Sequence, residues 1–288
     1  MIFDPESSDF TANLMIDDRQ RMFRVHQPQP AVDNRALIIA FHGTGINGQR
    51  MAEFCNLNSL ADESDFIVLY PDGSGRNEMS LQWNTGHSAS YATRHQVNDL
   101  EFVKRLIDWS IQHLQVDPGR VYLAGMSSGG ILCYELAIQI PSQLAAVASV
   151  AGTLRDFSRS PVAVPVIHFH GTNDSHVPYE GGRGARSLSQ IEFSSVGNTM
   201  DWWAKANQCT HRRMQRPHVT INDGTWIIRE AYLNSAEEER VLLYTIKNGG
   251  HTWPGSAWSE SAAHSLGTTT LNLQANQEIW SFFQKHKC

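Results

Sequence analysis

The sequence lacks the features that mark several protein classes. Its longest apolar stretches fall short of the roughly 20 residues that a membrane-spanning helix needs, so we expect no membrane span. It has no run of five or more basic residues, and its 29 acidic residues outnumber its 23 basic ones, giving a net charge of -6. Because nucleic-acid binding depends on concentrated positive charge, we expect no nucleic-acid partner.

Cysteine is scarce. The four cysteines are widely separated and form no CxxC pair, which argues against zinc and redox motifs. Cys133 falls in a predicted buried helix and is expected to pack as a small hydrophobic residue. Cys209 and Cys288 could form a disulfide only in a secreted protein.

A secretory signal and one phosphate-binding motif are missing as well. The first ten residues lack the charged and apolar regions of a secretory signal, so we expect a cytoplasmic protein. We expect a secreted protein only if the sequence is a trimmed mature form. The phosphate-binding pattern GxxxxGK[ST] does not occur, and we expect no cofactor. The oligomeric state is left open.

No repeat, low-complexity tract or linker divides the chain, and we predict a single domain over 1–288. Short apolar, β-branched runs alternate with segments of helical periodicity. This alternation predicts an α/β fold: a doubly wound, mostly parallel sheet with helices on both faces and no large cap domain. The predicted strands are 36–41, 66–70, 121–124, 145–150, 164–169 and 241–246, and the predicted helices are 97–114, 131–140, 199–206 and 272–285.

The most informative motif is Gly-Met-Ser-Ser-Gly at 125–129, between a predicted strand and a predicted helix. A sharp strand-to-helix turn needs small residues two positions before and after its serine, whose hydroxyl it exposes. Ser127 is therefore the candidate nucleophile. A serine hydroxyl is a weak nucleophile at neutral pH and needs a histidine, oriented in turn by a carboxylate.

The order Ser, Asp or Glu, His along the chain ranks the partners. Asp174 follows the predicted strand 164–169 and is the candidate acid, with Asp156 in reserve. His251 lies on a glycine-flanked loop after the predicted strand 241–246 and is the candidate base. His264, further along, is a weaker competitor.

The tetrahedral intermediate formed by a serine nucleophile also needs two backbone N–H groups that stabilise its oxyanion. Ser128, directly after the candidate nucleophile, would supply one. Thr44, on the loop after the predicted strand 36–41, would supply the other, with Gly43 as the alternative. His42 is expected to brace this loop.

His168 and His170 lie two residues apart on one predicted strand and so face the same side. That spacing could serve a metal, but no carboxylate or cysteine cluster accompanies it in the sequence. We expect two buried, hydrogen-bonded histidines and no metal.

Six motifs occur in the order seen in one family: HGTG at 42–45, YPDG at 70–73, WNTG at 83–86, GMSSGG at 125–130, HGTNDSHVPYEGG at 170–182 and GGHTWPG at 249–255. By these motifs the chain resembles the LpqC-like polyhydroxybutyrate depolymerases and feruloyl esterases, also called carbohydrate esterase family 1-like hydrolases, over about residues 14–285. The resemblance implies an α/β-hydrolase fold with Ser127, Asp174 and His251 as nucleophile, acid and base.

The resemblance also suggests how substrate is held. Trp83, Asn84 and Trp253 fall on loops expected to line an open cleft, where the aromatic rings could stack on a phenolic ring or cover a polyester chain. Residues 183–197 are expected to form a flap over the site.

These observations predict a serine ester hydrolase that acts through an acyl-enzyme on a small-molecule or polymer-borne ester. The first substrate class is a feruloyl (hydroxycinnamoyl) ester, and the alternative is a polyhydroxybutyrate or other polyester. A thioesterase or a peptidase is a further hypothesis, because a triad alone does not define the leaving group. A non-catalytic binding module on the same fold is the remaining hypothesis.

Overall fold

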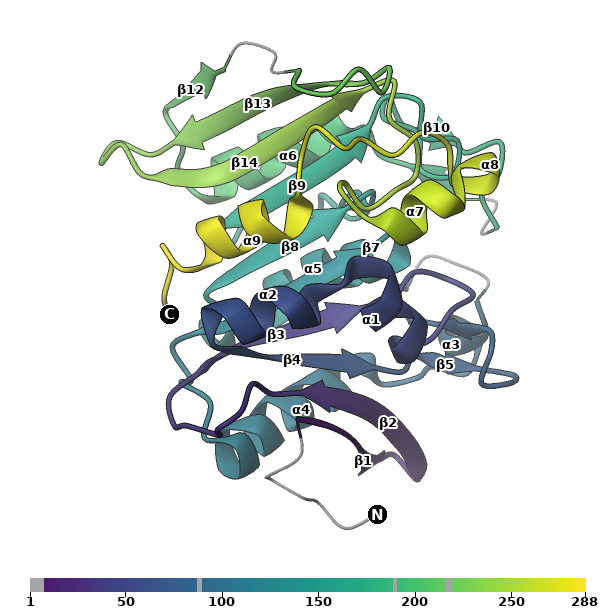
Figure 1. The fold of residues 1–288 in the computed structure, drawn as a ribbon, viewed down its shortest axis with the longest axis vertical. Coiled ribbons are helices and arrows are strands. Elements are labelled where there is room, and N and C mark those ends of the chain that lie inside the picture. Colours follow the sequence, from purple (N-terminus) through teal and green to yellow (C-terminus); the bar gives the residue numbers. More distant parts are fainter. Residues whose placement is uncertain (1–7, 87–89, 189–190, 216–218) are drawn as a thin grey trace.

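Ten strands form one sheet at the centre of the computed structural model, which describes residues 8–86, 90–188, 191–215 and 219–288 (Figure 1). The strands lie in the order β1-β2-β4-β3-β7-β8-β9-β14-β13-β12. All pairs from β4 to β14 are parallel, and the outer pairs at both edges are antiparallel. The strands are β1 (Asp9–Ile16), β2 (Arg19–His26), β3 (Ala36–Phe41), β4 (Phe66–Pro71), β7 (Val121–Met126), β8 (Ala146–Val150), β9 (Val166–Gly171), β12 (His211–Met214), β13 (Trp226–Leu233) and β14 (Glu239–Lys247).

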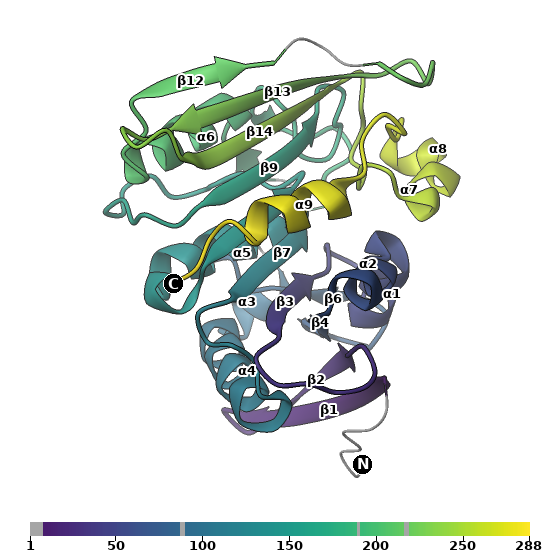
Figure 2. The ribbon, with the colours of Figure 1, turned by 60° about the vertical axis from the view of Figure 1, so that its left-hand side comes forward.

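Helices cover both faces of this sheet (Figure 2). One hydrophobic cluster joins alternate sheet residues such as Leu37 and Ile39 to α4, α5 and α6, and a second joins Ile38 and Ala40 to α1, α2 and α9. Successive residues of a strand point to opposite faces of the sheet. Since helices cover both faces, every residue of the continuous apolar run in β3 is buried. These helices are α1 (Gly48–Cys55), α2 (Leu57–Ser64), α4 (Asp99–Leu114), α5 (Ser128–Gln139), α6 (Val196–Ala206) and α9 (Ala275–Phe283).

Above the carboxyl ends of the strands lie loops with short elements only. Within the described residues none of them forms a large cap, which agrees with the predicted fold class. No helix of the described part is long and apolar enough to span a bilayer. The short elements are β5 (Ser74–Gly75), β6 (Leu81–Gln82), α3 (Tyr91–Arg94), β10 (Gly182–Arg183), β11 (Glu192–Phe193), α7 (Ala257–Ser261) and α8 (Ala263–Leu266). A 3₁₀ turn at Pro141–Gln143 links α5 to β8 at the opposite end of the sheet.

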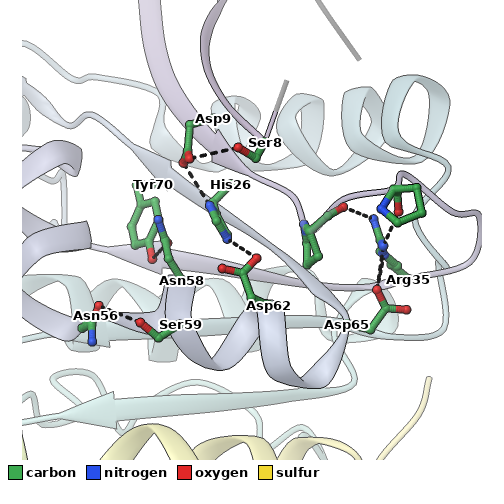
Figure 3. Close-up of polar contacts among 12 residues, drawn as sticks. Ser8, Asp9, His26, Arg35, Asn56, Asn58, Ser59, Asp62, Asp65 and Tyr70 are labelled. Atoms are coloured by element: carbon green, nitrogen blue, oxygen red, sulfur yellow. Dashed lines mark hydrogen bonds and ion pairs between the residues drawn. The ribbon is translucent and has the colours of Figure 1, made fainter. Parts of the chain in front are cut away.

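Charged groups tie the first strands to α2 (Figure 3). The His26 ring lies between two carboxylates, with Nδ1 2.9 Å from Asp9 and Nε2 3.1 Å from Asp62. Arg35 is buried and donates to Asp65 from Nε at 2.7 Å. The edge hairpin and the loop that leads into β3 are thereby fixed on the side of the sheet remote from β12.

Candidate active site

Ser127 occupies the tight turn between β7 and α5. Its backbone has φ 57° and ψ -118°, a conformation that costs a non-glycine residue of order 1–3 kcal/mol and that the surroundings must enforce. A Cβ on Gly125 would lie 2.3 Å from the Gly129 carbonyl oxygen, and one on Gly129 would lie 2.3 Å from that of Phe41. Glycine is therefore required at both flanking positions, which explains the motif in steric terms.

Two candidate oxyanion donors meet beside this turn. Ser128 is the first residue of α5, so its N–H has no partner within the helix. Thr44 follows β3, and its hydroxyl donates to Ser128 Oγ at 3.0 Å, which connects the two loops. The neighbouring N–H of Gly45 already donates to the Leu81 carbonyl at 2.9 Å.

Asp174 and His251 lie at the ends of neighbouring parallel strands. Asp174 follows β9 and His251 follows β14, and these strands pair with each other. His251 Nδ1 lies 2.7 Å from Asp174 Oδ2, and both residues are 5% exposed. The N–H groups of His176 and Val177 donate to the other oxygen, Oδ1, at 2.8 and 2.9 Å.

These contacts define the charge and the tautomer. Burial would raise the pKa of Asp174, but the charge of His251 and the hydrogen bonds from His170 and His251 outweigh it and hold this pKa well below its ordinary value. An ionised carboxylate only accepts hydrogen bonds, so Nδ1 of His251 carries a proton. In the neutral ring, Nε2 is then free to act as a base.

Ser127, Ser128, Thr44 and His251 line one cavity of about 380 Å³. Among the described residues that line it there is no Asp, Glu, Lys or Arg. Such a cavity accommodates an uncharged, largely apolar group. Its other lining residues include Ile46, Phe54, Trp83, Met126, Ile131, His176, Val177, Leu188, Ile191, Phe193, Trp258 and Leu266.

The three expected substrate-binding residues have different surroundings. Trp83 lines the cavity, although it is only 1% exposed and donates from Nε1 to the His42 carbonyl at 2.8 Å. Asn84 and Trp253 are not among the described residues that line this cavity. Asn84 donates to the Val97 carbonyl at 2.9 Å, and Trp253 is buried with Nε1 2.9 Å from Asn276 Oδ1.

The structure finds cavity residues that sequence reasoning missed. Trp258 and Leu266 come from α7 and α8, in a polar segment without clear periodicity. His176 stacks on His251 with ring centroids 4.7 Å apart. Its position two residues after Asp174 was the available signal, because the turn that presents the acid also presents its neighbours.

Described residues of the segment 183–197, the expected flap, lie against the site, and residues 189–190 of it are outside the described residues. Leu188, Ile191 and Phe193 line the cavity, and β10 and β11 pair as a small ribbon within this segment. From Val196 the chain belongs to α6.

The reserve candidates lie elsewhere. Asp156 bonds to Ser158 and lines a separate cavity, and His264 is exposed on α8. His42 braces its loop as expected, because its Nε2 accepts the N–H of Gly73 at 2.9 Å.

One group of described residues has ligand atoms spaced closely enough for a metal ion: Asp174, His176 and His251, within 4.8 Å of one another. A metal there would have to displace the proton shared by Asp174 and His251. The site as built therefore favours proton transfer. All four cysteines are free thiols, so Cys209 and Cys288 are not paired.

Residues 23–179 match a protein family described as esterase PHB depolymerase. The chain belongs to this family. The expected family, fold class and carboxylic ester hydrolase class are thereby confirmed.

The similar proteins are named as esterases or as a depolymerase. The chain is 28% identical to NocK of Nocardia uniformis subsp. tsuyamanensis, a protein named as an esterase, over 90% of this chain and 78% of that protein. It is 32% identical to a feruloyl esterase B of Piromyces equi over 64% of this chain, and 28% identical to poly(3-hydroxyalkanoate) depolymerase C of Paucimonas lemoignei over 91% of this chain. It spans only 33% and 66% of these last two proteins.

Solved esterase structures share the fold. An acetyl xylan esterase from Aspergillus awamori superposes with a TM-score of 0.58 at 14% identity, covering 90% of this chain and 99% of that one. A thermostable esterase superposes with a TM-score of 0.59 at 13% identity, covering 98% of this chain and 63% of that one. At these identities the likeness establishes the fold alone.

Proposed function

We propose that this family member is a serine esterase in which Ser127, His251 and Asp174 form the triad. The observation that carries the proposal is the buried 2.7 Å contact between Asp174 and His251, beside the cavity that Ser127 also lines. The strained turn exposes the serine, and the carboxylate fixes the imidazole tautomer.

The reaction runs in two steps. His251 Nε2 takes the Ser127 proton as Oγ forms a bond to the ester carbonyl carbon, and the N–H groups of Ser128 and Thr44 stabilise the oxyanion. The carbon–oxygen bond to the alcohol then breaks, and the alcohol leaves with the proton from His251. Water, deprotonated by the same histidine, cleaves the acyl-enzyme and regenerates the serine.

The substrate class follows from the cavity and the relatives. A cavity whose described lining has no Asp, Glu, Lys or Arg suits an uncharged acyl group, and aromatic lining residues such as Phe193 and Trp258 suit a planar ring. A relative named feruloyl esterase points the same way. We therefore place feruloyl (hydroxycinnamoyl) esters first, with Trp83 as a further contact.

A polyester is the second candidate, because the relative from Paucimonas lemoignei aligns over 91% of this chain and is named a depolymerase. Rates on methyl ferulate, on 3-hydroxybutyrate oligomers and on matched thioester and amide substrates separate these classes. Ferulate release faster than release from the oligomers supports the first class, and the reverse order overturns it.

The triad is tested with p-nitrophenyl acetate. Ser127→Ala and His251→Ala are expected to lower kcat by on the order of 10⁴-fold while the circular dichroism spectrum is retained. Near-normal turnover by either folded variant would contradict the assignment.

A further inference from the structure

A row of buried side chains leads away from Asp174 into the protein. Tyr134 OH lies 2.7 Å from His168 Nδ1, His168 Nε2 lies 3.0 Å from His170 Nδ1, and His170 Nε2 lies 2.8 Å from the Val177 carbonyl oxygen. All three side-chain groups are at most 1% exposed. The proposed mechanism uses none of them.

The protons in this row have a defined direction. A carbonyl oxygen only accepts, so His170 Nε2 must carry a proton. The neutral His168 ring carries one proton. With the Tyr134 hydroxyl donating to its Nδ1, that proton lies on Nε2 and is donated to His170 Nδ1. Burial lowers the pKa of His168 well below its ordinary value. Burial also raises the pKa of Tyr134 well above its ordinary value, so both groups are neutral at pH 7.

The row ends at Asp174 in two ways. His170 Nε2 lies 3.4 Å from Asp174 Oδ2, the oxygen that also contacts His251. The carbonyl that His170 holds belongs to Val177, whose N–H donates to Asp174 Oδ1 at 2.9 Å. His170 thus fixes both the carboxylate and the turn that presents it.

The other end of the row lies on the serine side of the site. Tyr134 belongs to α5, which begins at Ser128 directly after Ser127, and its ring packs against Trp203 at 5.4 Å. His168 and His170 lie on β9, which leads into Asp174. The row therefore spans from the helix that carries the serine to the loop that carries the acid.

We propose that His170 is a positioning residue for the Asp174–His251 pair, held in its donating tautomer by His168 and Tyr134. Without the Nε2–H the Val177 carbonyl loses its donor and the turn that carries Asp174 loosens. If every hydrogen bond of the row ran in the opposite direction, His170 Nε2 would carry no proton and would face the Val177 carbonyl and the Asp174 carboxylate. This inference rests on the proposed triad.

The test compares His170→Leu, which removes the donor, with His170→Gln, which keeps an N–H near Nε2. Because small displacements of catalytic groups are costly, His170→Leu is expected to lower kcat for p-nitrophenyl acetate about 10- to 100-fold with little change in KM. His170→Gln is expected to restore most of this loss. Thermal melting shows which variants fold, and Ser127→Ala gives the uncatalysed background.

Tyr134→Phe tests the far end of the row without placing a new group near Asp174. It is expected to lower kcat about 5-fold, the equivalent of one buried hydrogen bond. The matched control is Tyr179→Phe, which removes another phenol, bonded to Thr245 at 2.8 Å beside His170 but outside the row. This control is expected to leave kcat unchanged.

The outcomes separate two failures. If Ser127→Ala is as active as the parent, the proposed function fails. If Ser127→Ala is inactive but Tyr134→Phe and a folded His170 variant without the donor keep the parental kcat, the positioning role is wrong. The role is also overturned if His170→Gln is as slow as His170→Leu, or if Tyr179→Phe loses as much as Tyr134→Phe.

Discussion

At the scale of single residues, burial and hydrogen bonding separate two tryptophans that the sequence cannot distinguish. Trp253 follows His251 closely in the chain but packs against Phe54 and bonds to Asn276. Trp258, five residues later, lines the cavity. Proximity in sequence to a catalytic residue therefore does not predict contact with the substrate, because the chain turns between the two positions.

This difference yields a paired prediction. Trp258→Ala is expected to raise KM for methyl ferulate about 10-fold, since a large apolar contact of the cavity is lost. Trp253→Phe is expected to leave KM unchanged and to lower the free energy of unfolding by about 1 kcal/mol, because a buried hydrogen bond is lost. Steady-state kinetics and urea titration measure both. A larger KM effect from Trp253→Phe would reverse the assignment.

At the scale of elements, the oxyanion site depends on how the loop after β3 meets the start of α5. The contact between the Thr44 and Ser128 hydroxyls joins these two elements at 3.0 Å. Each hydroxyl belongs to a residue whose backbone N–H is the proposed donor. The side chains therefore fix the spacing of two backbone groups.

Thr44→Val keeps the shape of the side chain and removes this hydrogen bond. It is expected to lower kcat about 5-fold with KM unchanged, because the loss appears as the oxyanion forms. Ser128→Ala should act similarly. The double variant should be no slower than the slower single variant, since both changes remove one interaction. Fully additive losses would show that the two hydroxyls act independently.

The sequence predicts the central elements well and the edges poorly. The runs at 36–41 and 241–246 are continuous and apolar because β3 and β14 are buried on both faces, and the structure confirms both. The edge strand β12, with sequence HRRM, is exposed along its whole length and has no apolar pattern to detect. The strand-end rule led to Asp174 and His251, whereas Trp258 reaches the cavity through tertiary packing that no local pattern encodes.

At the scale of the whole molecule, several histidines are buried in the fold. Burial lowers the pKa of His42 to about 4 and that of His168 well below its ordinary value of 6.5. Both side chains are at most 1% exposed. The folded protein therefore holds them neutral in a range where the unfolded chain would protonate them.

This burial predicts acid sensitivity. Below pH 6.5 the unfolded chain binds protons that the folded chain does not, so the free energy of unfolding falls with decreasing pH, by about 1.4 kcal/mol per pH unit for each such histidine. For His42 the loss is complete near pH 4. The ionised Asp174 adds a further loss only below about pH 4, where the unfolded carboxylate protonates.

Urea titrations between pH 7.5 and 5 measure this slope. His42→Gln is expected to reduce the slope by about 1.4 kcal/mol per pH unit below pH 6, whatever its effect on stability at pH 7.5. An unchanged slope would show that His42 does not contribute to the acid sensitivity.

The central claim is that Ser127 is a nucleophile activated by His251 and Asp174. Its most direct test is peptide mapping by mass spectrometry after treatment with a fluorophosphonate, which reacts with activated serines. The account predicts a stoichiometric adduct on Ser127, formed at least 100-fold more slowly in His251→Ala. An unmodified Ser127, or an adduct that forms equally fast without His251, would contradict it.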